Sequence, residues 1–305
     1  MASPLAGDLL TVASSVCFAA ANVTVARGAR PDAEDNGAFV SLLITTVIAA
    51  AGWVLVGVLR GFEPVTARAL AWFAGAGVFT AFVGRVFFYA AIERLGAMRS
   101  STMKRLIPFF AVMLGVGVLG ERLTTGMIAG MALILASFAV LVAGARGRVA
   151  RNDSRQAPGI GWGYVYGPVS ALGYASGYLL RKLGLADAQD ALLGAAVGCL
   201  VGALLFLATA AFSARYGAAV RATFARPNGW LLAAGVLSSF GQILYFGALN
   251  LNPMSRVALV SSIEVFMTLL MAVVFLRRIE SLTVPVALAA ALGVGGTVLI
   301  MASEG

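Results

Sequence analysis

Histidine is absent from this chain of 305 residues, and cysteine occurs only twice. Histidine is the commonest metal ligand and general base in proteins, so its absence argues against zinc, haem and histidine-dependent enzymes. Cys17 and Cys199 both fall inside apolar runs, which argues against a disulfide framework. We therefore expect no metal site and no cofactor.

Charge is also scarce. Charged residues make up 11% of the chain, hydrophobic residues make up 60%, and the mean hydropathy is +0.93. A soluble domain averages about 25% charged and about 45–50% apolar residues. Lipid is therefore the natural solvent for this chain, and the bilayer is its expected partner.

The net charge of +9 is not a nucleic-acid signal. The 22 Lys and Arg residues outnumber the 13 acids, but they are scattered among short loops and form no dense basic face. Loop arginines in a membrane protein set its topology and meet anionic lipid headgroups. We expect a small-molecule substrate and no nucleic acid, and the sequence leaves monomer and homodimer open.

Ten apolar stretches reach the length of about 20 residues that crosses the hydrocarbon core. The sequence thus predicts an all-α membrane protein with ten transmembrane helices. The predicted spans are 6–26, 38–59, 69–91, 98–119, 124–143, 159–180, 191–212, 229–248, 254–276 and 283–302. The longest connections between them are 144–158 and 213–228.

An internal repeat divides the chain. Residues 89–119 align without a gap with residues 246–276, so that Arg99 lies opposite Arg256. The repeat predicts two five-helix units, at 1–143 and 159–305, joined by a linker over 144–158. Because each unit has an odd number of helices, the second must start on the other side of the membrane, as in inverted-repeat transporters.

Several short motifs support the same division. In the first half they are Tyr89-Ala90-Ala91, Leu95-Gly96-Ala97, Leu106-Ile107-Pro108-Phe109-Phe110 and Leu119-Gly120-Glu121-Arg122-Leu123-Thr124. In the second half they are Phe246-Gly247-Ala248 and Ile263-Glu264-Val265-Phe266, with a departure at Leu276-Arg277-Arg278. This set resembles the signature of EamA-type members of the drug/metabolite transporter superfamily.

The resemblance implies a multi-pass protein of the cell (inner) membrane with cytoplasmic termini. It implies secondary transport by alternating access, with export of an amino acid, another metabolite or a drug, and no enzyme activity. The alternatives are a membrane-embedded enzyme acting on a lipid-linked substrate and a lipid-handling protein or scaffold. Loops after odd-numbered helices carry 13 Lys and Arg against six after even-numbered helices, a bias that would put the termini outside.

The Leu-Gly-Glu motif also has a local interpretation. Gly120 can end a helix, and Glu121 can favour the positive N-terminal end of the next one. We expect a structural role for Glu121, at the start of the helix predicted over 124–143.

Few charges fall within the predicted spans. Glu264 lies near the middle of one, Arg85 lies within another, and Lys104 and Arg105 lie near the start of a third. A charge at a helix centre costs about 2.5–3.5 kcal/mol in lipid, so these groups should face protein, water or each other. Lys104 and Arg105 could equally reach the interface with their long side chains. Glu264 is either a proton carrier or an ion-pair partner of Arg85 or another buried base.

Two helical stripes predict a cavity. Arg85 and Tyr89 are four residues apart on one span, and Gln242 and Tyr245 are three apart on the corresponding span of the second repeat. We expect the substrate path between these helices. Further candidates for its wall are Trp162, Tyr174 and Asn22. The alternative is that these side chains only form hydrogen bonds between helices.

Overall fold

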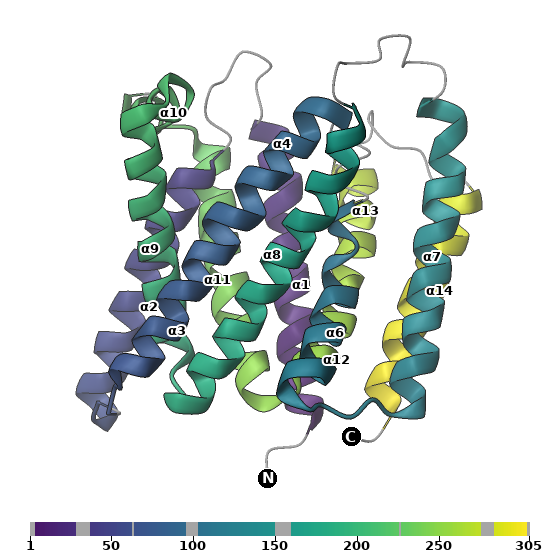
Figure 1. Cartoon of the computed structure of the whole chain (residues 1–305), viewed down its shortest axis with the longest axis horizontal. Helices are drawn as coiled ribbons and strands as arrows, with labels where there is room; N and C mark the ends of the chain where they lie inside the picture. The colour runs from purple at the N-terminus through teal and green to yellow at the C-terminus, as the bar shows by residue number, and fades with distance from the viewer. Residues whose placement is uncertain are drawn as a thin grey trace.

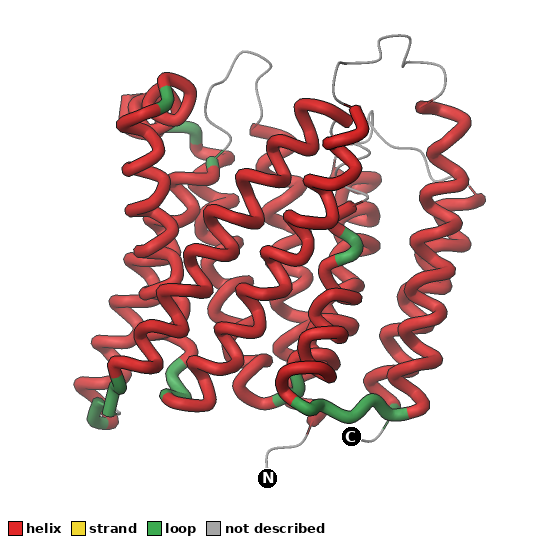
Figure 2. The backbone as a smooth tube through the Cα atoms, viewed as in Figure 1, coloured by secondary structure: helices red, strands yellow, loops and turns green. Residues whose placement is uncertain are grey.

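The computed structural model describes residues 4–28, 37–62, 64–95, 103–149, 160–225, 227–275 and 284–303. Within these ranges every regular element is a helix, and no strand occurs (Figure 2). The helices stand side by side as long rods in one bundle (Figure 1). A helix satisfies its own backbone hydrogen bonds, which is what an apolar segment needs in lipid.

The first half of the chain begins with two long helices and a third that changes its winding. Its elements are α1 (Pro4–Gly28), α2 (Ala38–Arg60), α3 (Ala67–Gly77), the π-helix η1 (Val78–Gly84), α4 (Arg85–Leu95), α6 (Ile107–Leu119) and α7 (Thr125–Val149). The three segments α3, η1 and α4 follow one another without a break. Helix α7 runs six residues past its predicted end, into the expected linker 144–158, and residues 150–159 lie outside the described part of the chain.

The second half follows the same order. Its elements are α8 (Ile160–Asp187), α9 (Ala191–Phe212), α10 (Ala214–Ala225), α11 (Gly229–Leu251), α12 (Met254–Val260), the 3₁₀ turn η2 (Ser261–Ile263), α13 (Glu264–Phe275) and α14 (Val284–Ala302). The sequence predicts only a connection over 213–228, where the structure has α10. That segment is rich in alanine, the strongest helix former, which explains the extra helix.

Seven helices of the described chain are long and apolar enough to cross a membrane. They are Pro4–Gly28, Ala38–Arg60, Ala67–Phe88, Ala191–Phe212, Gly229–Leu251, Met254–Phe275 and Val284–Ala302. The other three predicted spans correspond to α6, α7 and α8. Helix α6 and the described stretch Thr125–Leu141 of α7 are apolar but shorter, while α8 has 28 residues and a lower hydropathy because it contains six glycines and four tyrosines. The count of ten spans therefore stays a prediction.

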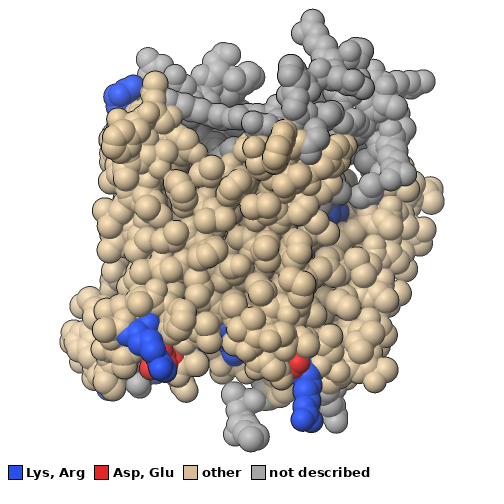
Figure 3. Space-filling model, in the orientation of Figure 1, with Lys and Arg blue, Asp and Glu red and all other residues tan. Residues whose placement is uncertain are grey.

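The outer surface fits a lipid environment. On the face in Figure 3, charged side chains lie mainly near the lower edge, with another basic group at the upper left corner, and the broad middle band is almost entirely uncharged. Large apolar side chains such as Val58, Leu59 and Phe212 are more than 70% exposed. In water such a surface would associate, whereas acyl chains cover it without penalty.

The helix contacts repeat between the two halves. Exchanging the halves pairs α1 with α8, α2 with α9, α3–α4 with α11, α6 with α12–α13, and α7 with α14. Under this exchange the packing of α1 on α11 matches that of α8 on α3–α4, and α1 on α13 matches α6 on α8. The α2–α9, α6–α12 and α7–α14 contacts map onto themselves.

Glycines set the closest approaches between the halves. A Cβ added to Gly296 on α14 would lie 2.7 Å from the carbonyl oxygen of Gly130 on α7. A Cβ on Gly77 of α3 would lie 2.4 Å from the carbonyl oxygen of Gly198 on α9. These helices touch backbone to backbone, as small residues allow in membrane bundles.

Candidate functional site

A polar cavity of about 270 Å³ lies in the middle of the bundle. Both repeats contribute to its wall. The lining residues are Phe18, Asn22, Ser41, Leu42, Thr45, Thr80, Ala81, Arg85, Lys104, Tyr174, Tyr178, Arg181, Ala195, Gly198, Cys199, Ser238, Gln242, Tyr245, Phe246 and Glu264. A cleft between helices with a few convergent polar groups is a usual form of a small-molecule site.

Of the eight candidates named from the sequence, six lie at the wall of this cavity. Those at its wall are Asn22, Arg85, Tyr174, Gln242, Tyr245 and Glu264. The side chain of Tyr89 lies outside the described residues. Trp162 does not line the cavity: it is 62% exposed, and its ring stacks on Tyr166 with 6.1 Å between centroids. Trp162 lies in the first turn of α8, twelve residues or about 18 Å along the helix from Tyr174.

The position of Arg85 depends on the π-helix η1. A π-helix makes i→i+5 hydrogen bonds, so Thr80 and Arg85 lie one turn apart and both line the cavity. The widened turn packs against glycines of α8, and Ser170 donates a hydrogen bond to the carbonyl oxygen of Gly84. Such π-segments are frequent at functional sites, and hydropathy patterns do not reveal them.

Glu264 is the acidic side chain at the cavity among those that the structure describes. It begins α13, directly after the 3₁₀ turn η2, and accepts a hydrogen bond of 3.0 Å from Asn22 on α1. It interacts electrostatically with Lys104, whose ammonium lies 4.5 Å from the ring centroid of Phe88 and 5.0 Å from that of Tyr174. The sequence left Arg85 or another buried base as the expected partner of Glu264, and that pairing stays a prediction. Arg105 points elsewhere, 5.3 Å from the ring centroid of Phe138 on α7.

The sequence did not single out Arg181, which is buried in the cavity wall. Its Nη1 donates to Oε1 of Gln242 at 3.1 Å, and its guanidinium carbon lies 4.8 Å from the ring centroid of Phe246. The predicted span ended at residue 180, one residue short. The spacing of Tyr174, Tyr178 and Arg181, four and three residues apart, was the signal of a single helical face.

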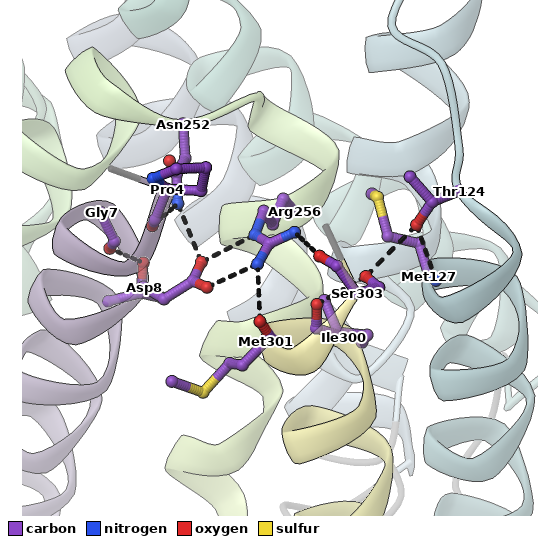
Figure 4. Close-up of polar contacts among 11 residues, drawn as sticks. Pro4, Gly7, Asp8, Thr124, Met127, Asn252, Arg256, Ile300, Met301 and Ser303 are labelled. Carbon is purple, nitrogen blue, oxygen red and sulfur yellow. Dashed lines mark hydrogen bonds and ion pairs between the residues drawn. The ribbon is translucent and has the colours of Figure 1, made fainter. Parts of the chain in front are cut away.

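A second polar cluster joins helices on the side where α1 begins and α14 ends, which we name the terminus side. Arg256 on α12 holds Asp8 on α1 through two hydrogen bonds, Nε to Oδ1 at 2.9 Å and Nη2 to Oδ2 at 2.7 Å (Figure 4). It also donates to the carbonyl oxygens of Ser303 and Met301, while Asn252 donates to Asp8 at 2.8 Å. Both charged side chains are almost fully buried.

Glu121 and Lys182 extend this closed layer. The two carboxylate oxygens of Glu121 accept hydrogen bonds from the backbone N–H groups of Met254 and Ser255, at 2.6 and 2.8 Å. Glu121 therefore caps α12 in the other repeat, whereas the sequence predicted the start of α7; Gly120 ends α6 as expected, with φ +68°. Lys182 donates to the carbonyl oxygens at the end of α11, at Leu249 and Asn252.

No group of three or more Asp, Glu, Cys or His side chains that could hold a metal ion occurs in the described part of the chain. The arrangement offers charge, hydrogen bonds and aromatic faces around a space. It can bind and enclose a small molecule.

Comparison with known proteins agrees with this geometry. The sequence profile of the EamA-like transporter family matches residues 5–143 and 161–302, so the chain belongs to this family and contains two copies of its repeat. It is a multi-pass membrane transporter of the drug/metabolite transporter superfamily.

A solved structure titled "Crystal structure of protein" superposes on 96% of this chain and 95% of its own, with a TM-score of 0.68 and 18% identity. It shares the fold. No curated protein matches the sequence significantly.

Proposed function

We propose that this protein is a secondary transporter that exports a small organic metabolite by alternating access around the central cavity. The observation that carries the proposal is the cavity itself, because helices of both repeats supply its polar wall. Alternating access needs a binding site between two units that can rock against each other.

Polar contacts lie on one side of the cavity, which supports a state of the transport cycle that is closed on that side. Along α12–α13, Arg256 precedes the cavity residue Glu264 by eight residues, or about 12 Å. The Asp8–Arg256 cluster, the Glu121 cap and the Lys182 contacts therefore lie between the cavity and the terminus side. Opening on that side requires these contacts to separate, and they join different helices.

Ten membrane crossings, as two inverted five-helix repeats, suit this cycle. Arg256 contacts Asp8 near the start of the chain and Ser303 near its end, so both ends lie on one side. The number of crossings is then even, which seven apolar helices alone cannot satisfy. Adding α6, α7 and α8 gives ten, with units at 1–143 and 159–305 and a linker over 144–158.

Two criteria disagree about which side faces the cytoplasm. The family resemblance puts the terminus side there, and the excess of loop Lys and Arg puts the other side there. A reporter that is active only in the cytoplasm, fused after Gly305, separates the two. Activity of this reporter would support the orientation that we propose, in which the terminus side faces the cytoplasm and export starts from that side.

A flux assay tests the function directly. Purified protein in liposomes, preloaded with one compound, should accumulate the labelled compound by counterflow, without chemical change. Gln242→Ala, within the cavity wall, should abolish counterflow, while Arg27→Gln on α1, a cation that does not line the cavity, should retain it. Product formation would instead indicate a membrane-embedded enzyme, and neither flux nor product would indicate a lipid-handling protein or scaffold.

Substitution of Glu264 distinguishes proton-coupled transport from uncoupled transport. If this carboxylate carries a proton, Glu264→Gln abolishes transport driven by a pH gradient and leaves counterflow intact. If it only balances Lys104, gradient-driven transport survives in that variant at full rate, and exchange or facilitated diffusion is the mechanism.

A further inference from the structure

The cavity contains more positive than negative charge. Arg85, Lys104 and Arg181 line it, and Glu264 is its acidic residue among the described side chains. Lys104 and Glu264, both in the cavity wall, attract each other, and Asn22 donates a hydrogen bond to the Glu264 carboxylate. The charges of Arg85 and Arg181 have no such counterpart in the described chain.

Arg181 is held by neutral groups. Its residue is 5% exposed, its Nη1 donates to the amide oxygen of Gln242, and its guanidinium plane lies near the rings of Tyr178 and Phe246. These contacts orient the guanidinium fork and leave its full charge in place. A planar guanidinium recognises the two oxygens of a carboxylate or phosphate group.

The hydrogen bonding of Arg85 is incomplete. Its Nη1 is buried and has no hydrogen-bond partner among the described residues. Buried polar groups are nearly always paired, so a buried donor in a binding cavity calls for an acceptor. Cys199 on α9 lies close enough to Arg85 and Arg181 to interact electrostatically with both, which puts the two charges around one part of the cavity.

The remaining wall is aromatic. Phe18, Tyr178, Tyr245 and Phe246 line the same cavity, and the rings of Tyr178 and Tyr245 lie 4.9 Å apart. At about 30 Å³ per water molecule, the 270 Å³ volume has room for about nine waters, the size of a compact organic acid. Buried charge within a membrane span is costly unless it is paired, which favours a ligand that supplies the missing negative charge.

We propose that the cavity selects organic anions, binding a carboxylate or phosphate group between Arg85 and Arg181 and an apolar body against the aromatic wall. This inference rests on the proposed transport function and adds the class of substrate. Lys104 and Glu264 balance each other beside this site, so a free amino group on the ligand is not required.

The test measures binding to the purified full-length protein with probes that share a phenyl ring and differ in charge. The anions are 3-phenylpropionate and phenyl phosphate, the neutral analogue is 3-phenylpropanamide, and the cation is 3-phenylpropylamine. We expect the better anion to bind at least about tenfold more tightly than the amide, because a charge-assisted bond is roughly twice as strong as a neutral one. Which anion binds better distinguishes a carboxylate site from a phosphate site.

Three variants should differ in their effect on the ratio of anion to amide affinity. Arg85→Gln should bring the ratio of anion to amide affinity close to one, and Glu264→Gln should raise this ratio because it frees the Lys104 charge. Arg27→Gln should leave the ratio unchanged, since Arg27 contacts Trp230 and does not line the cavity. The ratio is the readout because a variant that only loosens the fold weakens both ligands alike.

Equal or tighter binding of the amide or the amine overturns the proposal, and so does an Arg85→Gln variant with an unchanged ratio. Absence of binding by either anion up to about 1 mM, a weak limit for a transported substrate, overturns it as well. Counterflow of a neutral or cationic compound in the same preparation would keep the transporter and reject the anion site. Absence of any counterflow would reject the transport function itself.

Discussion

Arg256 and Asp8 form a bidentate ion pair that links α12 to α1 across 248 residues of sequence. The Asp8 side chain is 0% exposed and that of Arg256 is 4% exposed. Further acceptors on α14 and a donor at Asn252 complete the pair. One cluster thus ties together the start of the chain, its end and the first turn of α12.

Breaking this pair should strongly destabilise the bundle. Asp8→Asn leaves the Arg256 guanidinium buried without a counter-charge, which typically costs about 3–5 kcal/mol. The measurement is the temperature at which the detergent-solubilised protein loses its monodisperse elution peak.

The matched control is Asp187→Asn. Asp187 forms an ion pair with Arg68, whose side chain is 74% exposed, and exposed pairs contribute little. We expect a clearly smaller loss of thermal stability in this variant. Similar losses in both variants would show that the buried pair is not a structural lock.

Glu121 should stabilise α12 rather than α7. Removing its two backbone hydrogen bonds in Glu121→Ala should cost about 0.5–2 kcal/mol, the range for a lost N-cap. Amide hydrogen exchange should then rise at Met254 and Ser255. Thr124→Ala is the reciprocal variant, because Thr124 accepts a hydrogen bond from Met127 N–H at the start of α7. If Glu121→Ala raises exchange at Met127 instead, the cap belongs to the neighbouring helix.

Glu121 illustrates what sequence reasoning reaches and what it misses. Its structural role and the helix end at Gly120 follow from local patterns, but its partner lies 133 residues away, and a local rule chose the adjacent helix. Spans and facing stripes were predictable because helical spacing and hydropathy are local. From these local patterns the sequence predicted that Arg85 and Gln242 face one cavity, and both line it in the structure.

The misses have related causes. Arg181 lies one residue beyond a predicted boundary, and Trp162 lies on the same helix as Tyr174 but in its first turn. Asp8 gave no signal, because its partner is on a distant segment. The π-helix before Arg85 packs against α8, and no hydropathy pattern marks it in the sequence.

Gly295 and Gly296, adjacent on α14, should differ sharply in how well they tolerate substitution by alanine. An added Cβ at Gly296 would meet the Gly130 carbonyl oxygen at 2.7 Å, whereas one at Gly295 meets nothing within 4 Å. Gly296→Ala must push α7 and α14 apart, and overpacking of this kind costs about 1–3 kcal/mol. Gly295→Ala should be neutral or slightly stabilising, since alanine favours the helix. Thermal stability of the two variants in detergent is the comparison, and equal stability would contradict the packing.

Cys199 offers a native reporter of access to the cavity. It lines the cavity on α9, while Cys17, the other cysteine, does not, so Cys17→Ser leaves a single thiol in the site. The Asp8–Arg256 cluster closes the terminus side. A membrane-impermeant thiol reagent applied in sealed vesicles should therefore label Cys199 from the opposite side and not from the terminus side.

Weakening the closed layer should reverse that preference. Adding Asp8→Ala to the Cys17→Ser background removes the carboxylate that joins α1 to α12, so labelling of Cys199 from the terminus side should rise. Vesicle orientation is scored by protease removal of a C-terminal tag, and Asp187→Ala serves as the control. Equal labelling from both sides before the change would mean that the polar cluster does not seal the cavity. An unchanged pattern after it would mean that the seal lies in the apolar packing around Phe246 and Leu249 rather than in the ion pair.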